Sequence, residues 1–291
     1  MFQRCGFADA RSDIEDADFV IFGLPFDSTT SFRSGSRDAP DAMRHASYNF
    51  ETYDQRHDID LADIPICDIG NMGLGSDPAC AWEAIKSGLS TLPEEAITVA
   101  MGGEHSITPP IVEHLASTTE GGLGVIVLDA HLDLREEYGC TVFSHACVSR
   151  RVLEMDGVSG FVSIGIRSGS KEEFRFAADN RISFFTCEDV SLSGIDGVLD
   201  EALAALEASG YERIYLSLDF DVIDPAYAPA VGNPEPFGLS PKDVAAVIDR
   251  LAPVVAGLDI TEITPAYDHG QTAILGARMA REFMATRSKS L

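Results

Sequence analysis

The chain has 291 residues, of which 45% are hydrophobic, so it is long and apolar enough to bury a large core. Its 47 acidic residues outnumber 21 basic ones, and the formal net charge of −26 makes nucleic acid and anionic membranes poor partners. It has neither an apolar run of about 18 residues nor an apolar segment near its amino terminus, so we expect no transmembrane helix and no secretory signal.

The acidic excess is spread along the whole chain, and lysine occurs only four times. Self-repulsion of this size is tolerable where salt at about 1 M shortens the screening length to about 3 Å. We interpret the charge as a halophilic adaptation to a very salty cytoplasm; the alternative is an ordinary acidic enzyme at the extreme of its range. Six cysteines without a CxxC pair also indicate a cytoplasmic protein with reduced, mostly buried thiols.

Apolar runs with the composition of strands alternate with amphipathic stretches typical of helices. We expect strands at residues 18–24, 64–70, 97–103, 124–130, 161–166, 181–186, 213–221 and 254–260. We expect helices at residues 40–48, 79–92, 107–116, 195–209, 240–251 and 271–286. The alternation predicts an α/β fold with a mostly parallel sheet covered by helices on both faces. No shift in composition marks a linker, so we expect a single domain over residues 1–291.

The segment GVIVLDAHLDL (124–134) ends an apolar run in alternating polar residues. The residues before Asp129 are typical of a strand that is buried on both faces. Asp129, His131 and Asp133 follow at every second position, so strand periodicity predicts that their side chains lie on one side of the backbone. Such a cluster at the end of a buried strand needs a positive charge between its members.

Polar residues also follow two other predicted strands. Asp219 and Asp221 lie two residues apart where the run RIYLSLDFD ends, and His105 follows the run ITVAMGG. In a parallel sheet, such segments meet beyond the carboxyl ends of the strands. Taken alone, each could be a turn aspartate or an ordinary hydrogen-bonded histidine. With the DAHLD segment they supply four carboxylates and two neutral imidazoles. Two divalent cations would neutralise the four negative charges of the carboxylates.

Mostly oxygen ligands with a minority of imidazole favour Mn²⁺ over Zn²⁺. A paired site of this kind holds its ions roughly 3.5–4 Å apart. A structural zinc site is the alternative, but such sites prefer closed shells rich in cysteine, and the sequence has no cysteine cluster.

Two further residues are candidates for catalysis. Glu262 follows the last predicted strand and could hold a cationic substrate through paired hydrogen bonds. His145 begins a helix after the loop that leaves DAHLD, and a histidine outside the ligand set could shuttle protons. The alternatives are a solvated loop carboxylate and a water-exposed histidine at a helix start.

These motifs resemble those of the ureohydrolase family, which contains arginase, agmatinase and their relatives. The resemblance is carried by GGEHS (102–106), DAHLD (129–133), SLDFDVIDPAYAP (217–229) and ITEITP (260–265), which occur in the family's order, and by the segment PFDSTTSFRSGSRDAPDAMR (25–44). It implies the arginase-like fold, a three-layer α/β/α domain around an eight-stranded parallel sheet, assembled as a homotrimer or homohexamer.

The resemblance also implies a role for each site residue. Two Mn²⁺ ions would share two of the aspartates. The first ion would be held by His105, Asp129, Asp133 and Asp219, and the second by Asp129, His131, Asp219 and Asp221. His145 matches the family's proton-shuttling histidine, and Glu262 matches the carboxylate that binds the guanidinium group.

The chain departs from the family pattern at GNPEPFG (232–238), where relatives usually have GTPEPGG, and this puts the shape of that loop in doubt. Glu104 stands where many members have aspartate, a position that is not a ligand. The stretch LREEYGCTVFSHA (134–146) looks more like archaeal agmatinases than arginases. The resemblance therefore implies hydrolysis of agmatine to putrescine and urea, a step of polyamine biosynthesis.

In the expected mechanism, a hydroxide that bridges two Mn²⁺ ions attacks the guanidinium carbon. Glu262 would set that carbon in line for attack. Asp133 would relay a proton to the departing amine, and His145 would replace that proton from solvent.

Several alternatives remain open. Arg135 could pair with the carboxylate of guanidinobutyrate or guanidinopropionate, whereas Glu136 and Glu137 could attract the ammonium group of agmatine. Arginine and formiminoglutamate are further possible substrates with the same metal motifs. A deacetylase is disfavoured because those enzymes carry one metal. A catalytically dead module that binds metal or polyamine is also disfavoured, because it would normally lack a ligand.

Overall fold

The computed structural model of the protein describes residues 6–291 and contains an eight-stranded parallel sheet. Across the sheet the strands follow the order β4-β1-β5-β10-β9-β6-β7-β8. Their bounds are β1 Phe19–Leu24, β4 Ile66–Asn71, β5 Ile97–Gly102, β6 Leu123–Leu128, β7 Val158–Ile166, β8 Ser183–Thr186, β9 Arg213–Asp219 and β10 Val255–Thr261. All eight strands expected from the sequence are present, because continuous apolar runs are typical of strands with helices on both sides.

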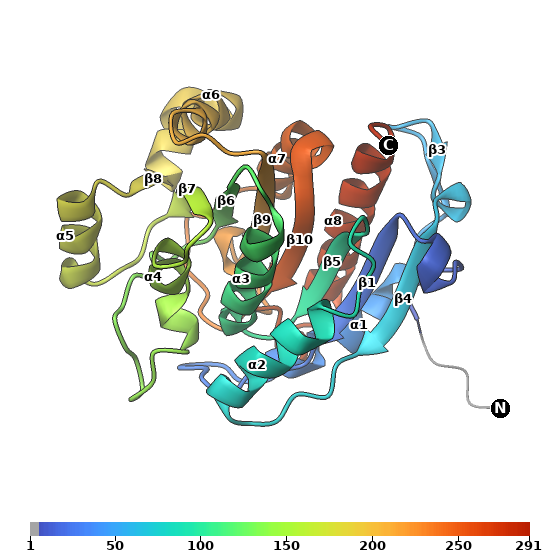
Figure 1. The fold of residues 1–291 in the computed structure, drawn as a ribbon, viewed down its shortest axis with the longest axis horizontal. Coiled ribbons are helices and arrows are strands. Elements are labelled where there is room, and N and C mark those ends of the chain that lie inside the picture. Colours follow the sequence, from blue (N-terminus) through green and yellow to red (C-terminus); the bar gives the residue numbers. More distant parts are fainter. Residues whose placement is uncertain (1–5) are drawn as a thin grey trace.

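Helices cover both faces of this sheet, so the predicted three layers are confirmed. One face is packed by α1 Ala39–Ser47, α6 Cys187–Glu207, α7 Pro241–Leu251 and α8 Gln271–Ser288. The other is packed by α2 Pro78–Leu89, α3 Thr108–Thr118 and α4 Val148–Leu153. Figure 1 shows α2 and α3 in front of the strands, with β5, β10 and β9 running behind them.

Three features were not expected from the sequence. Helix α5 (Lys171–Asn180) lies between β7 and β8, and a short antiparallel pair joins β2 (Tyr53–Asp54) to β3 (Ile59–Asp60). Helix α6 begins at Cys187, eight residues before the expected start, and is broken at Gly194, whose φ is 72°. The break explains the error, because the amphipathic pattern is continuous only beyond it.

The four strands that precede the sequence motifs are neighbours in the middle of the sheet. They follow the order β5-β10-β9-β6, and they end at Gly102, Thr261, Asp219 and Leu128 respectively. The prediction that the motifs lie together beyond the carboxyl ends of the strands is therefore confirmed.

Among residues 6–291, none of the helices has the length and hydrophobicity needed to cross a membrane. The five cysteines in this part of the chain are free thiols, and Cys5 lies outside the described residues. Only Cys67 and Cys147 are buried, whereas Cys80 and Cys140 are exposed. The expectation of mostly buried thiols is therefore wrong, because Cys80 lies on the outer side of α2 and Cys140 in an exposed loop.

Candidate active site

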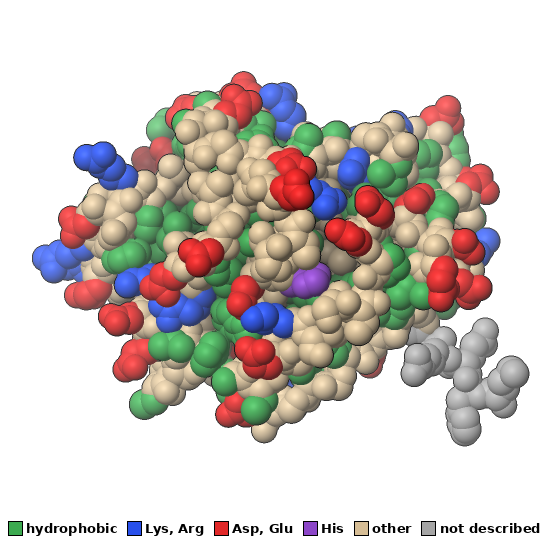
Figure 2. Space-filling model, in the orientation of Figure 1, with side chains coloured by type: hydrophobic (Ala, Val, Ile, Leu, Met, Phe, Trp, Pro, Cys, Tyr) green, Lys and Arg blue, Asp and Glu red, His purple; other side chains and the backbone are tan. Residues whose placement is uncertain are grey.

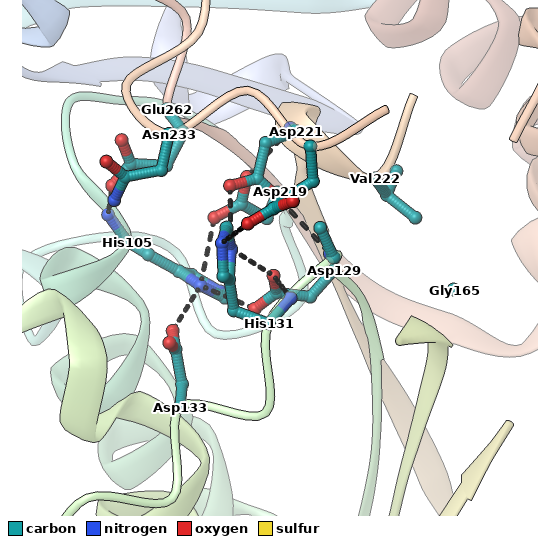
Figure 3. Close-up of polar contacts among 12 residues, drawn as sticks. His105, Asp129, His131, Asp133, Gly165, Asp219, Asp221, Val222, Asn233 and Glu262 are labelled. Atoms are coloured by element: carbon teal, nitrogen blue, oxygen red, sulfur yellow. Dashed lines mark hydrogen bonds and ion pairs between the residues drawn. The ribbon is translucent and has the colours of Figure 1, made fainter. Parts of the chain in front are cut away.

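His105 lies at the centre of three carboxylates. Its Nδ1 atom is 3.3 Å from Asp129 Oδ2, 3.2 Å from Asp133 Oδ2 and 3.2 Å from Asp219 Oδ2. All four side chains are buried. Figure 3 shows them pointing toward one another from separate segments of the chain. One imidazole nitrogen thus faces three carboxylate oxygens that belong to two different strand ends.

His131 forms a second, overlapping group. Its Nδ1 atom lies 3.0 Å from Asp221 Oδ2 and 3.6 Å from Asp129 Oδ1. Asp129 therefore directs one oxygen toward each histidine. The potential ligand atoms of His105, Asp129 and Asp219 lie within 4.8 Å of one another, and so do those of Asp129, His131 and Asp221. The geometry brings together all six residues predicted to hold metal, in two groups that share Asp129.

We expected strand periodicity to bring the DAHLD side chains together, but their convergence has another cause. Strand β6 ends at Leu128, and His131 forms only an isolated bridge with Ser168. Asp133 has a left-handed backbone with φ 49°. The three side chains meet because the loop turns back over the end of the strand, a path that an alternating pattern does not reveal.

The pKa values show how strongly these carboxyl groups disturb one another. Burial, together with the charge of Asp129, raises the pKa of Asp133 to about 7. Burial and the charges of Asp221 and Asp129 raise the pKa of Asp219 well above its usual range. Burial lowers the pKa of His105, but its three carboxylate neighbours outweigh this effect and raise the pKa well above 6.5. In this environment, protons supply the charge balance that a cation would otherwise provide.

The donor set fits divalent cations. Asp129 Oδ2 is buried without a hydrogen-bond partner. Within residues 6–291, no lysine or arginine forms an ion pair with Asp129, Asp133, Asp219 or Asp221. The opposite case is Asp54 and Glu282, which form another potential metal-binding group with His57 but are bridged by Arg278, with distances of 2.7 Å to each.

Hydrogen bonds at Nε2 of His105 determine which nitrogen of the ring can bind a cation. Nε2 lies 3.1 Å from Ser217 Oγ, and Ser217 donates its own proton to Asp259 Oδ1 at 2.7 Å. Asp259 also accepts hydrogen bonds from Tyr215 and Thr108. Because the Ser217 proton is already used, Nε2 of His105 must be the protonated nitrogen. A cation that displaces the second proton of the ring would therefore bind at Nδ1, on the side of the carboxylates.

Glu262 follows β10 directly and has a left-handed backbone with φ 64°. Its Oε1 atom accepts the backbone N–H of His105 at 2.8 Å, and its side chain lines the same cleft. A Cβ atom on Gly232 would lie 2.5 Å from the other carboxylate oxygen, so glycine there leaves room for the group. Burial, and then the charge of Glu104, raises the pKa of Glu262 to about 8.

His145 begins a 3-10 turn (His145–Cys147) that leads into α4. The predicted helix start is therefore present, but the side chain is buried rather than exposed to water. Burial, and then the charges of His105 and His131, lowers the pKa of His145 to about 4. Its ring is consequently neutral near pH 7, with Thr29 and Ser31 as hydrogen-bond neighbours.

A cleft of about 300 Å³ lies over the cluster. Its outer wall includes Arg135, Tyr138 and Glu173. The Arg135 guanidinium group lies 3.5 Å from the Glu173 carboxylate and 5.1 Å from the centre of the Tyr138 ring. Glu136 and Glu137 are exposed and border a separate depression. Arg135 therefore lines the cleft, whereas the two glutamates are outside it.

Arg167, which the sequence did not single out, ties two loops of the site together. It donates to the carbonyl oxygens of Asp221 at 2.7 Å and Val222 at 3.2 Å, and to those of Glu235 at 2.7 Å and Pro236 at 3.1 Å. The loop 232–238 is thereby joined to the backbone of a predicted ligand. This role of Arg167 could not be predicted from the sequence, because its partners are backbone atoms of distant segments.

Phe237, in the same loop, stands where relatives usually have glycine. It has φ 66°, and 88% of its surface is exposed. The residue keeps the left-handed conformation that suits glycine. The change from the family pattern therefore adds an exposed aromatic ring to the surface of the loop, at a backbone conformation that L side chains rarely adopt.

The comparisons with known proteins agree with this geometry. The sequence model of the arginase family matches residues 17–286. An agmatinase from Pyrococcus horikoshii is 38% identical over 275 residues, which cover 92% of this chain and 91% of that protein. An N(1)-aminopropylagmatine ureohydrolase from Thermococcus kodakarensis is 37% identical, with 91% and 89% covered.

The solved structure of an agmatine ureohydrolase from Thermoplasma volcanium superposes with a TM-score of 0.92. It is 40% identical and covers 99% of this chain and 96% of that one. The resemblance to agmatinases, the arginase-like fold and the prediction of an enzyme of the ureohydrolase type are confirmed. The chain belongs to the arginase family.

Proposed function

We propose that the protein is a binuclear manganese hydrolase that cleaves agmatine to putrescine and urea. The observation that carries the proposal is the cluster of buried carboxylates and two imidazoles, without a lysine or arginine ion pair in residues 6–291, at the floor of a cleft. Its oxygen-rich donor set suits Mn²⁺. The agmatinase from Pyrococcus horikoshii, at 38% identity, supports the choice of substrate.

Six residues would hold two ions, which lower the pKa of water and so supply a nucleophile at neutral pH. The ligands of the first ion would be His105, Asp129, Asp133 and Asp219, and those of the second Asp129, His131, Asp219 and Asp221. Ser217 contributes indirectly, since it keeps the proton of His105 on Nε2.

Glu262 would bind and orient the guanidinium group. A carboxylate matches two parallel N–H donors of a guanidinium group, and the hydrogen bond from His105 fixes its orientation. The pKa of about 8 shows that burial without a cation disfavours the charged form. A bound guanidinium cation would reverse this effect and hold the carboxylate in its ionised state.

Protons are needed at the departing amine, because an amine is a poor leaving group as an anion. Asp133 lies within the cluster and would relay a proton to that nitrogen. His145 would accept and return protons at the cleft, since its neutral ring is available near pH 7. The two residues would thereby divide proton delivery between the reacting centre and solvent.

An agmatine derivative with a longer cationic tail is the second candidate substrate. The Thermococcus kodakarensis relative is named for N(1)-aminopropylagmatine, and it is 37% identical. The outer wall of the cleft argues against a guanidino acid, because Arg135 already faces the Glu173 carboxylate. An acidic tail would have to compete with that contact.

The proposal is tested by urea release from a panel of agmatine, N(1)-aminopropylagmatine, arginine and guanidinobutyrate, with formiminoglutamate assayed by formamide release. Each assay is run with added Mn²⁺ and again after chelation, at low and multimolar salt. We expect Mn²⁺-dependent turnover with the highest kcat/KM for agmatine. Turnover that is highest on guanidinobutyrate would overturn the substrate assignment, and turnover that survives full chelation would overturn the metal assignment.

The shuttle role of His145 predicts that His145→Ala lowers kcat for agmatine. Because a positioned proton carrier contributes roughly 10²–10⁴-fold, we expect a loss of at least about a hundredfold with KM changed little. Steady-state kinetics between pH 7 and 9 measure this loss, and His45→Ala, at an exposed histidine of α1, is the matched control. Full turnover by His145→Ala across that pH range would contradict the proton-shuttle role of His145.

A further inference from the structure

The ring of His145 has a hydroxyl group near each of its nitrogens. Thr29 Oγ1 lies 3.1 Å from Nδ1, and Ser31 Oγ lies 3.3 Å from Nε2. A neutral imidazole carries one proton on one nitrogen and accepts a hydrogen bond at the other. The nitrogen that can take up a proton in the cleft therefore depends on what the two hydroxyl groups do with their own protons.

The Thr29 hydroxyl has no proton left for the ring. It donates to Glu104 Oε1 at 2.6 Å, while the backbone N–H of Thr29 donates to Glu104 Oε2 at 2.8 Å. The buried Glu104 side chain accepts a third hydrogen bond from Ser106 at 2.7 Å. The Thr29 hydroxyl also accepts the backbone N–H of His145 at 3.0 Å. Its second lone pair faces Nδ1 at 3.1 Å, whereas the Ser144 hydroxyl, the other neighbour of Nδ1, lies farther away at 3.4 Å, so the geometry favours a proton on Nδ1.

On the opposite side of the ring, a hydroxyl group can donate a hydrogen bond to Nε2. Asn233 Nδ2 donates to Ser31 Oγ at 3.1 Å, which leaves the Ser31 proton available for His145 Nε2. The competing contact from Ser31 to Asn233 Oδ1 is longer, at 3.4 Å. Ser31, Asn233 and His145 all line the cleft. Hydrogen bonds thus run in one direction, from Asn233 through Ser31 and the imidazole to Thr29 and Glu104.

We propose that Thr29, supported by Glu104, is a positioning residue that fixes His145 as its Nδ1–H tautomer. Nε2 then carries the lone pair of the ring, which accepts the Ser31 hydroxyl proton at the cleft. The lone pair becomes available when that hydroxyl turns to Asn233 Oδ1, 3.4 Å from Ser31 Oγ. Nε2 takes up a proton to give the imidazolium ion and returns the same proton, while Nδ1–H remains bonded to Thr29 throughout. Thr29 acts through the imidazole and not on the substrate. The inference rests on the proposed function, in which His145 carries protons.

Kinetics of three variants test the role. Thr29→Val removes the hydroxyl group at nearly constant volume, Thr29→Ser keeps it, and Thr30→Val makes the same change one residue away, where the hydroxyl bonds only the Asp27 carbonyl. For the Mn²⁺-loaded enzyme, we expect Thr29→Val to lower kcat about tenfold to a hundredfold with KM changed less than about threefold. Thr29→Ser should restore most of kcat, and Thr30→Val should match the parent protein.

The tautomer itself is read by nitrogen NMR of ring-labelled histidine in the full chain, with diamagnetic Zn²⁺ in place of Mn²⁺. The His145 signals are assigned by their loss in His145→Ala. We expect Nδ1–H in the parent protein and in Thr29→Ser, and a shift toward Nε2–H in Thr29→Val, where Ser144 Oγ, 3.4 Å from Nδ1, can donate instead. An Nε2–H tautomer in the parent protein would overturn the proposal, as would Thr29→Val with an unchanged tautomer and unchanged kcat.

The two readouts separate this inference from the proposed function. If the parent protein released no urea from any guanidino compound, the proposed function would fail, but the NMR experiment would still decide which nitrogen Thr29 keeps protonated. If the parent protein were active and Thr29→Val equally active, the positioning role alone would be lost.

Discussion

Each carboxylate at the floor of the cleft is buried beside another carboxylate. Asp129 has an oxygen without a hydrogen-bond partner, and the pKa values of Asp133 and Asp219 are raised by burial and by neighbouring charge. Removing one such group therefore has opposite effects with and without a cation. It relieves repulsion in the metal-free chain and removes a ligand from the metal-loaded one.

Asp219→Asn should separate these effects. We expect the metal-free variant to unfold at a temperature equal to or above that of the metal-free parent protein. Saturating Mn²⁺ should stabilise the parent by about 2.7 kcal/mol at a hundredfold excess over Kd, and the variant by far less. Thermal unfolding with and without Mn²⁺, together with metal analysis, measures both. The exposed Asp200→Asn is the control, and equal Mn²⁺ stabilisation of both variants would contradict the ligand assignment.

The pKa values of Asp133 and Glu262, about 7 and about 8, also predict a pH dependence for the metal-free chain. A carboxyl group with a raised pKa keeps its proton in the folded chain after the unfolded chain has lost it. Its stabilising contribution is therefore full below about pH 4 and is lost as the pH rises through 7 and 8. We expect the free energy of unfolding to fall by about 1 kcal/mol or more between pH 6 and 9.

Urea unfolding in the presence of a chelator measures this fall. The double variant Asp133→Asn, Glu262→Gln should flatten the profile, since neither amide titrates. A profile that is equally steep in both proteins would assign the effect to other groups.

The sequence located the six predicted ligands because each follows an apolar run that could only be a buried strand. It did not indicate that Thr29 contacts His145, because 116 positions of the sequence separate the two residues. It also did not indicate that Glu104 accepts a hydrogen bond from Thr29. It also missed the left-handed backbone of Asp133 and Glu262. Loop geometry depends on the packing of distant segments, and residue order alone does not contain it.

At the level of elements, the eight strands of the main sheet were predictable, whereas the short β2–β3 pair and helix α5 were not. Helix α5 carries a polar sequence, KEEFRFAADN, and only Glu173 and Ala177 are buried. Its apolar pattern was therefore weak. Its start nevertheless had a signal, because Ser170 and Glu173 form a capping box in which each side chain bonds the other's backbone N–H.

Glu173 both caps helix α5 and holds the loop that follows Asp133, so its substitution tests whether these contacts stabilise the fold. Its carboxylate also accepts the backbone N–H of Leu134, which follows Asp133. We expect Glu173→Ala to lower the free energy of unfolding by about 2–3 kcal/mol, because it removes a cap and leaves a buried N–H without a partner. Glu172→Ala, on the exposed side of the same first turn, should change it by less than about 0.5 kcal/mol.

Urea unfolding of both variants gives the comparison. Two variants of equal stability would show that the contacts of Glu173 do not support the fold.

The whole molecule carries a net charge of −26. Figure 2 shows acidic side chains scattered over the entire visible face rather than gathered in one patch. Such a distribution suits screening by concentrated salt, whereas it gives no single binding site for a cationic partner. The halophilic origin, the cytoplasmic location, the single domain over residues 1–291 and the trimeric or hexameric assembly stay predictions.

Salt should therefore stabilise the protein. We expect the midpoint of thermal unfolding to rise by several degrees between about 0.1 M and 3 M KCl, as the screening length falls from about 10 Å to below 3 Å. Glycerol of matched viscosity is the solvent control. Replacing the exposed Glu94 and Glu95 by glutamine should reduce the salt dependence, and a midpoint that does not rise with KCl would identify an ordinary acidic enzyme.

Arg167 gives the cleft a mechanical link that crosses its rim. The same guanidinium group joins the carbonyl oxygens of Asp221 and Glu235, so loop 232–238 cannot swing outward without pulling on the backbone of a predicted ligand. The Glu235 carboxylate lies 3.7 Å from His131 Nε2, so the side chain of the loop also approaches the cluster. If the cluster holds ions as proposed, a change that loosens loop 232–238 and speeds substrate entry would also shorten the time for which the ions stay bound.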